Sequence, residues 1–270
     1  MGFDFTGKTV FITGASNGLG KIIALSFAMH NTSILILTGK NQARLENVIA
    51  ECTVHCQNTF GIVGDMNNND DIERILSFVE EKSSNKLDIF IGNHGITKHQ
   101  EFDQINAENG DSIQTNYMSS FDHIMNINFT SNVKLTNRLC RIMPKDSSIV
   151  FTTSIHSNFA SSKSSAYCSS KAALKMFAKC AALDLGSRGI RVNTVAPGTM
   201  NTDFHHEEYD SKEKQDEQLH LLGKKLPRKH LTSLQGVANA ILFLASDKAA
   251  DITGSEQIVD CGQSLLMGEG

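Results

Sequence analysis

Three side chains in the second half of the chain have the types and the spacing needed to move a proton. Tyr167 and Lys171 stand four residues apart, and Ser154 lies thirteen residues before the tyrosine. A helix places residues i and i+4 on one face, so the Lys171 ammonium can lie beneath the Tyr167 phenol. A cation there favours the phenolate and lowers the tyrosine pKa from its usual value near ~10. The spacing predicts an acid/base catalyst.

A glycine-rich turn near the N-terminus is the second feature with chemical meaning. The run TGASNGLG, from Thr13 to Gly20, joins a short apolar run to a stretch with helical periodicity. Glycines keep such a turn tight and let a pyrophosphate approach the free N–H groups of the following helix. The same glycines could be plain punctuation between a strand and a helix. Their place within a strand-helix-strand unit favours dinucleotide binding, and with it a nicotinamide-dependent redox enzyme.

Short apolar runs rich in Val, Ile and Phe must position these residues, and they alternate with longer helical stretches. They predict strands at 8–13, 33–38, 60–64, 87–92, 148–153, 190–196 and 257–260. Runs apolar on both faces indicate strands covered on both sides, so the chain is predicted to be α/β with a doubly wound parallel sheet. Ligands bind such sheets at the carboxyl ends of the strands, where the residues above converge.

Length, charge and cysteine content narrow the class of protein. The 270 residues contain no linker and fit one domain, 1–270. A net charge of −4 with scattered Lys and Arg argues against nucleic acid as a partner. The sequence shows neither a signal sequence for export nor a run of ~20 apolar residues that could span a membrane, so the expected location is cytoplasmic. The six cysteines show no disulfide spacing, and Cys52, His55 and Cys56 lack the second pair of a zinc site, so reduced thiols and no metal are expected.

The joint pattern resembles a known family along essentially the whole chain, to the final ITGSEQIVDCG. The chain is similar to the simple, single-domain branch of the short-chain dehydrogenase/reductase family at TGxxxGxG from Thr13 to Gly20, Asn128, Ser154, the Tyr167-x-x-x-Lys171 pair and Pro197-Gly198. The resemblance implies a Rossmann fold of about seven strands. It also implies an oxidoreductase that transfers hydride between a nicotinamide and the carbonyl or secondary alcohol of a small molecule.

The resemblance implies a role for each matched catalytic position. Tyr167 would be the general acid toward a carbonyl oxygen, or the base in alcohol oxidation, and Ser154 would orient that oxygen. Lys171 would lower the tyrosine pKa and bind the nicotinamide ribose. Asn128 would anchor a water that links Lys171 to solvent. Physical chemistry agrees independently, because hydride delivery builds alkoxide charge that donors aimed at the oxygen stabilise.

The cofactor would lie across the strand ends. Asp65 matches an adenine contact, although it could instead cap a helix beginning near Asn67. Thr199 and Thr202 match contacts to the carboxamide and the phosphates. The complete set of expected cofactor contacts is Thr13, Gly14, Ser16, Asn17, Gly18, Leu19, Gly20, Lys40, Asp65, Met66, Asn93, Gly95, Lys171, Pro197, Gly198, Thr199 and Thr202.

The choice between NADP(H) and NAD(H) depends on the end of the second strand. An acid there would accept the ribose 2′-hydroxyl of NAD, but the sequence is Thr38-Gly39-Lys40-Asn41, with no acid. Lys40 could meet a 2′-phosphate, with Ser16 or Asn17 adding hydrogen bonds. The sequence therefore predicts NADP(H), with NAD(H) as the alternative if Lys40 is an exposed lysine that holds nothing.

Three segments depart from the family pattern. Gly92-Asn93-His94-Gly95 stands where most members carry Asn-Asn-Ala-Gly; we expect His94 to fold outward as a surface residue, the alternative being an approach to cofactor or substrate and titration near neutral pH. The segment 97–119 is longer than usual. The polar segment 199–231 is predicted to be a substrate lid, or else a solvated surface helix.

Two other functions remain open at this stage. A cofactor-binding regulator or scaffold without efficient catalysis would be consistent with His94 and the longer loop. A lyase or epimerase could use the same tyrosine. The resemblance also implies a homodimer or homotetramer, assembled through the helix that carries Tyr167 and the preceding helix with Asn128.

Overall fold

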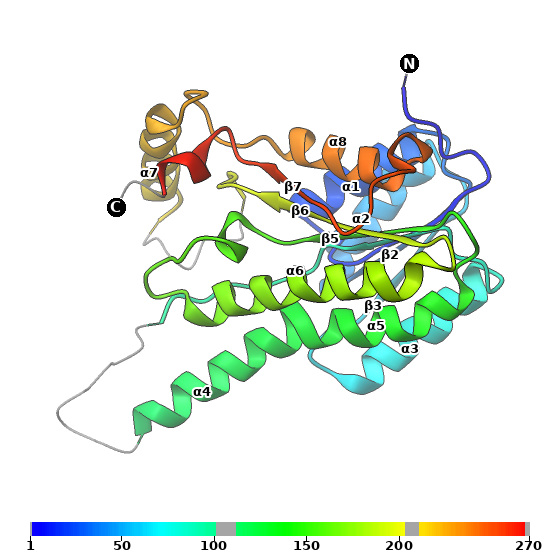
Figure 1. The fold of residues 1–270 in the computed structure, drawn as a ribbon, viewed down its shortest axis with the longest axis horizontal. Helices are drawn as coiled ribbons and strands as arrows, with labels where there is room; N and C mark the ends of the chain where they lie inside the picture. The colour runs from blue at the N-terminus through cyan, green and yellow to red at the C-terminus, as the bar shows by residue number, and fades with distance from the viewer. Residues whose placement is uncertain (1, 101–111, 203–210, 268–270) are drawn as a thin grey trace.

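A seven-stranded parallel sheet organises the computed structural model, which describes residues 2–100, 112–202 and 211–267 (Figure 1). The strands are β1 (Thr9–Ile12), β2 (Ile34–Gly39), β3 (Thr59–Val63), β4 (Ile89–Gly92), β5 (Ser148–Thr152), β6 (Arg191–Pro197) and β7 (Glu256–Val259). Their order is β3-β2-β1-β4-β5-β6-β7, and every pairing is parallel. The predicted doubly wound sheet is confirmed. The chain changes direction across the sheet between β1 and β4, which creates a topological switch point.

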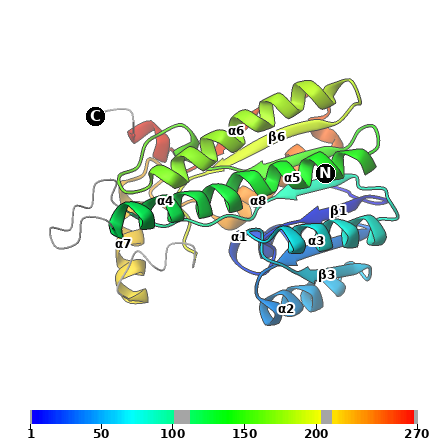
Figure 2. The same ribbon diagram turned by 90° about the horizontal axis from the view of Figure 1, so that it is seen from below.

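Helices cover both faces of the sheet. They are α1 (Gly18–Met29), α2 (Gln42–Thr53), α3 (Asn69–Lys82), α4 (Ser112–Met125), α5 (Ser131–Leu139), α6 (Ser165–Gly186), α7 (Lys212–Lys225) and α8 (Leu234–Ala245). A π-helical turn, Asn126–Thr130, joins α4 to α5, and short 3-10 turns follow several elements. Figure 2, seen from below, shows α3, α5 and α6 in front of the sheet.

The alternation of side chains along each strand divides the core into two clusters. Val10 and Ile12 of β1 pack with α1, α2 and α8 in one cluster, whereas Phe11 packs with α3, α5 and α6 in the other. Successive side chains of a strand point to opposite faces, so a strand with helices on both sides must be apolar at every position. This explains why apolar runs predicted the strands to within one or two residues, although the edge strand β7 carries Glu256 and Gln257 and is only partly buried.

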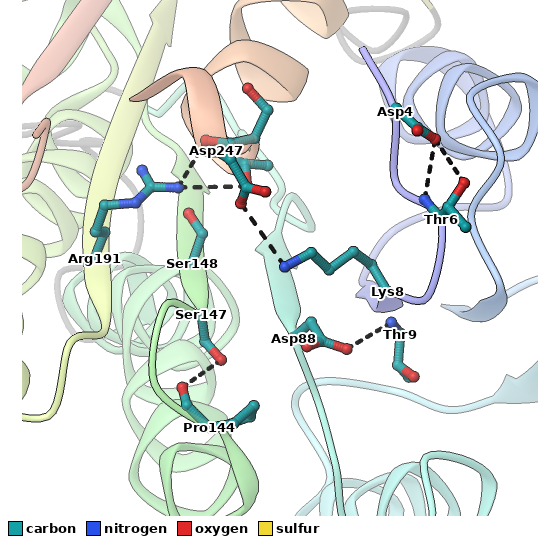
Figure 3. Close-up of polar contacts among 12 residues, drawn as sticks. Asp4, Thr6, Lys8, Thr9, Asp88, Pro144, Ser147, Ser148, Arg191 and Asp247 are labelled. Atoms are coloured by element: carbon teal, nitrogen blue, oxygen red, sulfur yellow. Dashed lines mark hydrogen bonds and ion pairs between the residues drawn. The ribbon is translucent and has the colours of Figure 1, made fainter. Parts of the chain in front are cut away.

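The amino ends of the strands are joined by polar contacts (Figure 3). Before β1, Lys8 pairs with Asp247 at 3.7 Å, and Thr9 N–H donates to Asp88 Oδ2 at 2.9 Å. The buried Arg191 guanidinium donates to the carbonyl oxygens of Leu244 at 2.6 Å and Ser246 at 3.0 Å, which supplies partners to the C-terminal end of α8. These contacts join β1 to β4, and join β1 and β6 to the segment at the end of α8.

The thiol of Cys52 is buried against the sheet, as part of one of the two apolar clusters. Burial raises the pKa of this thiol to about 12, so it stays protonated at neutral pH. The cysteines of the described chain are free thiols, as the sequence predicts.

Cys261 adopts a left-handed backbone conformation, with φ at 56°. A Cβ atom in this region costs about 1–2 kcal/mol, which glycine avoids. We expect Cys261→Gly to raise the free energy of unfolding by about 0.5–1 kcal/mol, because the greater flexibility of glycine in the unfolded chain offsets part of the gain.

Urea unfolding of the variant and the parent measures this difference. Asn31→Gly is the matched control: Asn31 has φ at 63°, but asparagine tolerates this region, so the gain should be smaller. A Cys261→Gly protein no more stable than its parent would show that the Cys261 side chain makes contacts worth as much as the strain.

Candidate active site

A cavity of about 630 Å³ opens at the carboxyl edge of the sheet. Its walls come from the segments that follow β1 to β6, as expected for a doubly wound sheet. The predicted residues on these walls are Gly14, Ser16, Asn17, Gly18, Leu19, Gly20, Lys40, Asp65, Met66, Asn93, Gly95, Ser154, Tyr167, Lys171, Pro197, Gly198, Thr199 and Thr202. Thr13 and Asn128 lie behind the wall, fully buried.

The glycine-rich turn passes closely over its neighbours. A Cβ on Gly20 would lie 2.0 Å from Gly14 O and 2.7 Å from Asn93 Nδ2, so only glycine fits there. Asn93 Nδ2 donates to Thr13 O and Gly14 O at 3.3 Å each, and the Thr13 hydroxyl accepts from Asn93 N–H at 3.0 Å. Thr13 therefore supports the turn from behind. The turn then presents the N-terminus of α1 to the cavity, where free N–H groups suit a phosphate.

Lys171 and Tyr167 face the cavity from the first turns of α6. The Lys171 Nζ atom donates to Thr152 O at 2.9 Å and lies 5.8 Å from the centre of the Tyr167 ring. Burial lowers the pKa of this lysine to about 8. The ammonium is charged at neutral pH, and it lies beside the phenol as the four-residue spacing predicts.

Ser154 completes this group of side chains at the end of β5. It caps a short 3-10 turn, Ile155–Ser157, and its hydroxyl accepts from His156 N–H at 3.2 Å. A buried carboxylate supports the same segment, because Glu256 Oε1 accepts from Thr153 Oγ1 at 3.1 Å and from Ser157 Oγ at 3.0 Å. These contacts hold Ser154 on the same cavity wall as the tyrosine.

Glu256 in turn pairs with a second lysine of α6. Lys175 Nζ lies 2.7 Å from Glu256 Oε2, and Asn158 donates to the same oxygen at 2.8 Å. Burial raises the pKa of Glu256, but the hydrogen bonds from Lys175 and Asn158 outweigh it, so its pKa lies below the usual value. The carboxylate therefore stays charged at neutral pH.

Asn128 lies in the π-helical turn and is fully buried. Its Oδ1 accepts from Ile96 N–H at 2.8 Å, and its Nδ2 donates to Ile96 O at 2.9 Å and Ser170 Oγ at 3.0 Å. Gly95 passes between the Lys171 ammonium and the Asn128 amide. A Cβ on Gly95 would lie 3.1 Å from Lys171 Nζ and 3.2 Å from Asn128 Oδ1. Asn128 thus holds the segment after β4 against Lys171. Its contact with a water stays a prediction.

The orientation expected for His94 is wrong. The side chain turns inward instead of outward, leaving the residue 7% exposed, with Nδ1 at 2.7 Å from Thr13 Oγ1 and Nε2 at 2.7 Å from Ser131 Oγ. Burial and, less strongly, the Lys171 charge lower its pKa to about 3, so titration near neutral pH is also contradicted. The imidazole finds four hydrogen-bond partners inside the fold, Thr13, Ile127, Ser131 and Asn132, which makes burial favourable.

Lys40 is exposed and pairs with Asp65 at 2.7 Å. Its contact with a 2′-phosphate stays a prediction. The chain has no acid directly after β2, but the neighbouring strand β3 supplies one. Burial raises the pKa of Asp65, and the hydrogen bonds from Lys40 and Asn67 N–H outweigh this and hold it below its usual value. Asp65 does not cap α3: that helix begins at Asn69 and Asn68 caps it.

Several residues on the cavity wall escaped the sequence analysis. Arg44 lies near Lys40 in the first turn of α2. Its position three residues after the helix cap Asn41 is a sequence signal that could have placed it on the cavity wall. His123, His156 and Met200 also line the cavity, but no spacing rule marks them. Their side chains come from α4, from the 3-10 turn after β5 and from the segment after β6.

The predicted lid, 199–231, is described in part, because residues 203–210 lie outside the described chain, as do 101–111 of the longer segment 97–119. Within it, α7 buries a stripe of Gln215, Leu219 and Gly223, and Gln215 Nε2 donates to Thr202 O at 3.0 Å. At its start, Thr199 N–H donates to Gln263 Oε1 at 2.8 Å. The lid stays a prediction.

Known proteins resemble this chain over nearly its whole length. A family model described as enoyl-(acyl carrier protein) reductase matches residues 14–264. The L-xylulose reductase of Caenorhabditis elegans is 31% identical over 265 residues, which cover 97% of this chain and 98% of the relative. A 3-oxoacyl-[acyl-carrier-protein] reductase of Rickettsia bellii is 30% identical over 267 residues, covering 97% and 99%.

Solved structures agree with the fold. A short-chain type dehydrogenase/reductase from Mycobacterium marinum has a TM-score of 0.83 at 25% identity and covers 97% of both chains. A 7α-hydroxysteroid dehydrogenase in complex with NADH and 7-oxo glycochenodeoxycholic acid has a TM-score of 0.82 at 28% identity, covering 96% and 95%. In the described part of the chain, no helix has the length and apolar character to cross a membrane.

Proposed function

The chain belongs to the short-chain dehydrogenase/reductase family of oxidoreductases, and from this premise we propose that it is an NADP(H)-dependent carbonyl reductase. It would reduce a ketone or aldehyde, or oxidise a secondary alcohol, in the cavity at the carboxyl edge. The observation that carries the proposal is the convergence of Ser154, Tyr167 and Lys171 on one wall of that cavity.

The cavity fits a nicotinamide dinucleotide. The turn at Gly14 and Gly20 leaves no room for a Cβ, which brings the backbone N–H groups within reach of a pyrophosphate. Lys40 and Arg44 provide positive charge on the part of the wall that follows β2, and Lys171 provides it beside Gly95, after β4. The bound nicotinamide would supply or accept the hydride.

Tyr167 would move the proton that accompanies the hydride. In the reductive direction its phenol donates to the carbonyl oxygen as negative charge develops there, and Ser154 donates a hydrogen bond to the same oxygen. Lys171 remains charged below about pH 8 and stabilises the phenolate that is left. Asn128 and the segment it holds keep this lysine in place. The cytosol, which the sequence predicts as the location, would favour reduction by its NADPH.

NADPH preference would come from Lys40 and Arg44. A 2′-phosphate could replace Asp65 as the partner of the exposed Lys40 ammonium, and Arg44 offers a planar donor pair nearby. We expect Lys40→Asp to weaken NADPH binding by about 10- to 100-fold, which corresponds to a lost charge-assisted contact. NADH binding should be unchanged or tighter, because this dinucleotide lacks the phosphate and the new carboxylate can accept its ribose 2′-hydroxyl.

Fluorescence titration with each dinucleotide measures this effect. Lys86→Asp is the matched control, since it makes the same charge change at an exposed residue before the amino end of β4. Unchanged NADPH affinity in Lys40→Asp would refute the contact between Lys40 and the 2′-phosphate. NADH preference in the parent protein would overturn the cofactor assignment and leave the catalytic residues unaffected.

One of the two observations that favoured a non-catalytic regulator on the same fold no longer favours it. His94 favoured it as a disturbance of the cofactor loop, but this side chain is buried with hydrogen-bond partners. Assembly into a homo-oligomer through α6 remains part of the proposal. Met176 and Leu183 of that helix are 58% and 83% exposed, which suits a covered face better than a solvated one.

A further inference from the structure

His94 connects the glycine-rich turn to the π-helical turn of Asn128. On one side its Nδ1 lies 2.7 Å from Thr13 Oγ1, directly behind the glycines. On the other, its Nε2 lies 2.7 Å from Ser131 Oγ and 3.0 Å from Ile127 O. The imidazole therefore spans two segments that are far apart in the sequence, the end of β1 and the junction of α4 with α5.

These partners favour one tautomer of the ring. Nε2 lies 3.0 Å from Ile127 O, which can only accept, and 3.4 Å from Asn132 Nδ2, which can only donate. The shorter contact favours a proton on Nε2, donated to Ile127 O. The Ser131 hydroxyl already donates to Ile127 O at 2.6 Å, so its oxygen is available to accept from the same Nε2–H. Nδ1 then accepts from the Thr13 hydroxyl at 2.7 Å, a shorter contact than the 3.3 Å from the same hydroxyl to Ile91 O. The neutral ring satisfies its three shortest contacts, whereas an imidazolium would direct a second N–H at the Thr13 oxygen, which already accepts from Asn93 N–H at 3.0 Å and from His94 N–H at 3.4 Å.

The backbone around His94 transmits this position to the site. A Cβ on Gly14 would lie 2.8 Å from His94 Cα, so the loop after β4 and the glycine turn are in close contact. Two residues later, Ile96 is held by both polar atoms of the Asn128 amide. Between them, Gly95 packs against Lys171 Nζ and Asn128 Oδ1. A shift of the loop at His94 would therefore move the surroundings of the Lys171 ammonium.

We propose that His94 is a positioning residue that sets the distance between the glycine-rich turn and the Asn128 turn, and through it the place of Lys171. The proposal rests on the proposed hydride transfer, because Lys171 matters there. His94 exchanges no proton with the substrate. Its contribution is a buried hydrogen-bonded bridge, made by a side chain that reaches both turns at once.

Three substitutions of His94 distinguish a hydrogen-bonding role of its ring from a role in packing alone. His94→Ala removes the ring, His94→Leu fills the space without polar atoms, and His94→Gln keeps one N–H donor and one acceptor. We expect Ala and Leu to lower kcat by about 10- to 100-fold while the KM for NADPH changes by less than about threefold, as happens when a group that orients a catalytic residue is lost. Gln should recover at least half of the parent kcat, with an unchanged pH profile.

Nuclear magnetic resonance of the parent protein gives a readout that does not depend on turnover. Nitrogen-15 spectra, assigned by comparison with His94→Gln, should show the Nε2–H tautomer and no titration of this ring between pH 5.5 and 8. A titrating ring, or an Nδ1–H tautomer, would overturn the bridge even if the protein proved inactive. In an active protein, kcat retained in His94→Ala or His94→Leu, or not recovered in His94→Gln, would overturn the positioning role.

Discussion

Tyr167→Phe is expected to lower kcat by about 10²- to 10⁴-fold while leaving NADPH affinity within about threefold of the parent. The substitution removes one oxygen, the atom that would give its proton to the carbonyl. The ring stays, so its contacts near Lys171 Nζ, which lies 5.8 Å from the ring centre, should survive. A loss confined to kcat would identify the phenol as a group that acts in the transition state.

Tyr117→Phe provides the matched control for this loss. Tyr117 lies on α4, and its hydroxyl is hydrogen-bonded to Ser165 Oγ at the start of the helix that carries Tyr167. The same atom is removed close to the same helix but away from the cavity wall. We expect the control to keep more than half of the parent kcat. Full activity in Tyr167→Phe would refute the acid/base role, and equal losses in both variants would indicate a disturbed helix instead.

Lys171→Met should abolish turnover and, at the same time, stabilise the protein without cofactor. The buried ammonium lowers the lysine pKa from 10.5 to about 8, which corresponds to a desolvation penalty of about 3 kcal/mol at neutral pH. Methionine has no such penalty, although the hydrogen bond to Thr152 O is lost, at about 1 kcal/mol. We therefore expect a net gain of about 2 kcal/mol in the free energy of unfolding.

The pH dependence of this gain gives it a signature. Between pH 8 and 10.5 the unfolded chain binds a proton at Lys171 that the folded chain does not, so this group makes the parent more stable as the pH rises. The gain from methionine should therefore be largest below pH 8 and shrink toward pH 10. Urea unfolding of both proteins at pH 7, 8, 9 and 10 measures the difference.

Lys175→Met is the matched control, one helical turn further on. Its ammonium pairs at 2.7 Å with the nearly buried Glu256 carboxylate, so methionine there leaves a charge without its cation and should destabilise the protein. If Lys171→Met were less stable than the parent at pH 7, favourable contacts of the Lys171 ammonium would outweigh its desolvation penalty. The opposite effects expected for Lys171→Met and Lys175→Met would then not be found.

The sheet and the proximity of Tyr167 to Lys171 could be predicted because both depend on short-range patterns. The run from Val10 to Ile12 is apolar on both faces, which indicates a strand covered by helices on both sides whatever its neighbours are. Tyr167 and Lys171 meet because a helix of 3.6 residues per turn brings them together. Glycines at the start of α1 indicated a close backbone approach, and the structure places Gly14 O where a Gly20 side chain would be.

The direction of His94 could not be predicted, because its partners are distant in the sequence. The ring meets Thr13 from 81 residues earlier and Ser131 from 37 residues later, and no local pattern reveals either contact. The loop itself gave no periodicity from which to infer an inward face. Lys40 is a similar case, because its acid comes from the adjacent strand at Asp65. Such pairings are set by strand order, which spacing rules do not describe.

Transfer of deuterium from labelled NADPH tests the central claim most directly. The protein would be incubated with NADPH carrying deuterium at C4, on either face, and with carbonyl compounds of the classes named for its relatives: L-xylulose, a 3-oxoacyl thioester and a 7-oxo bile acid. Mass spectrometry would follow the products. We predict an alcohol with one deuterium on the former carbonyl carbon from at least one compound, and none with Tyr167→Phe. Cofactor binding without deuterium transfer to any of them would contradict the proposed reaction and favour a cofactor-binding regulator.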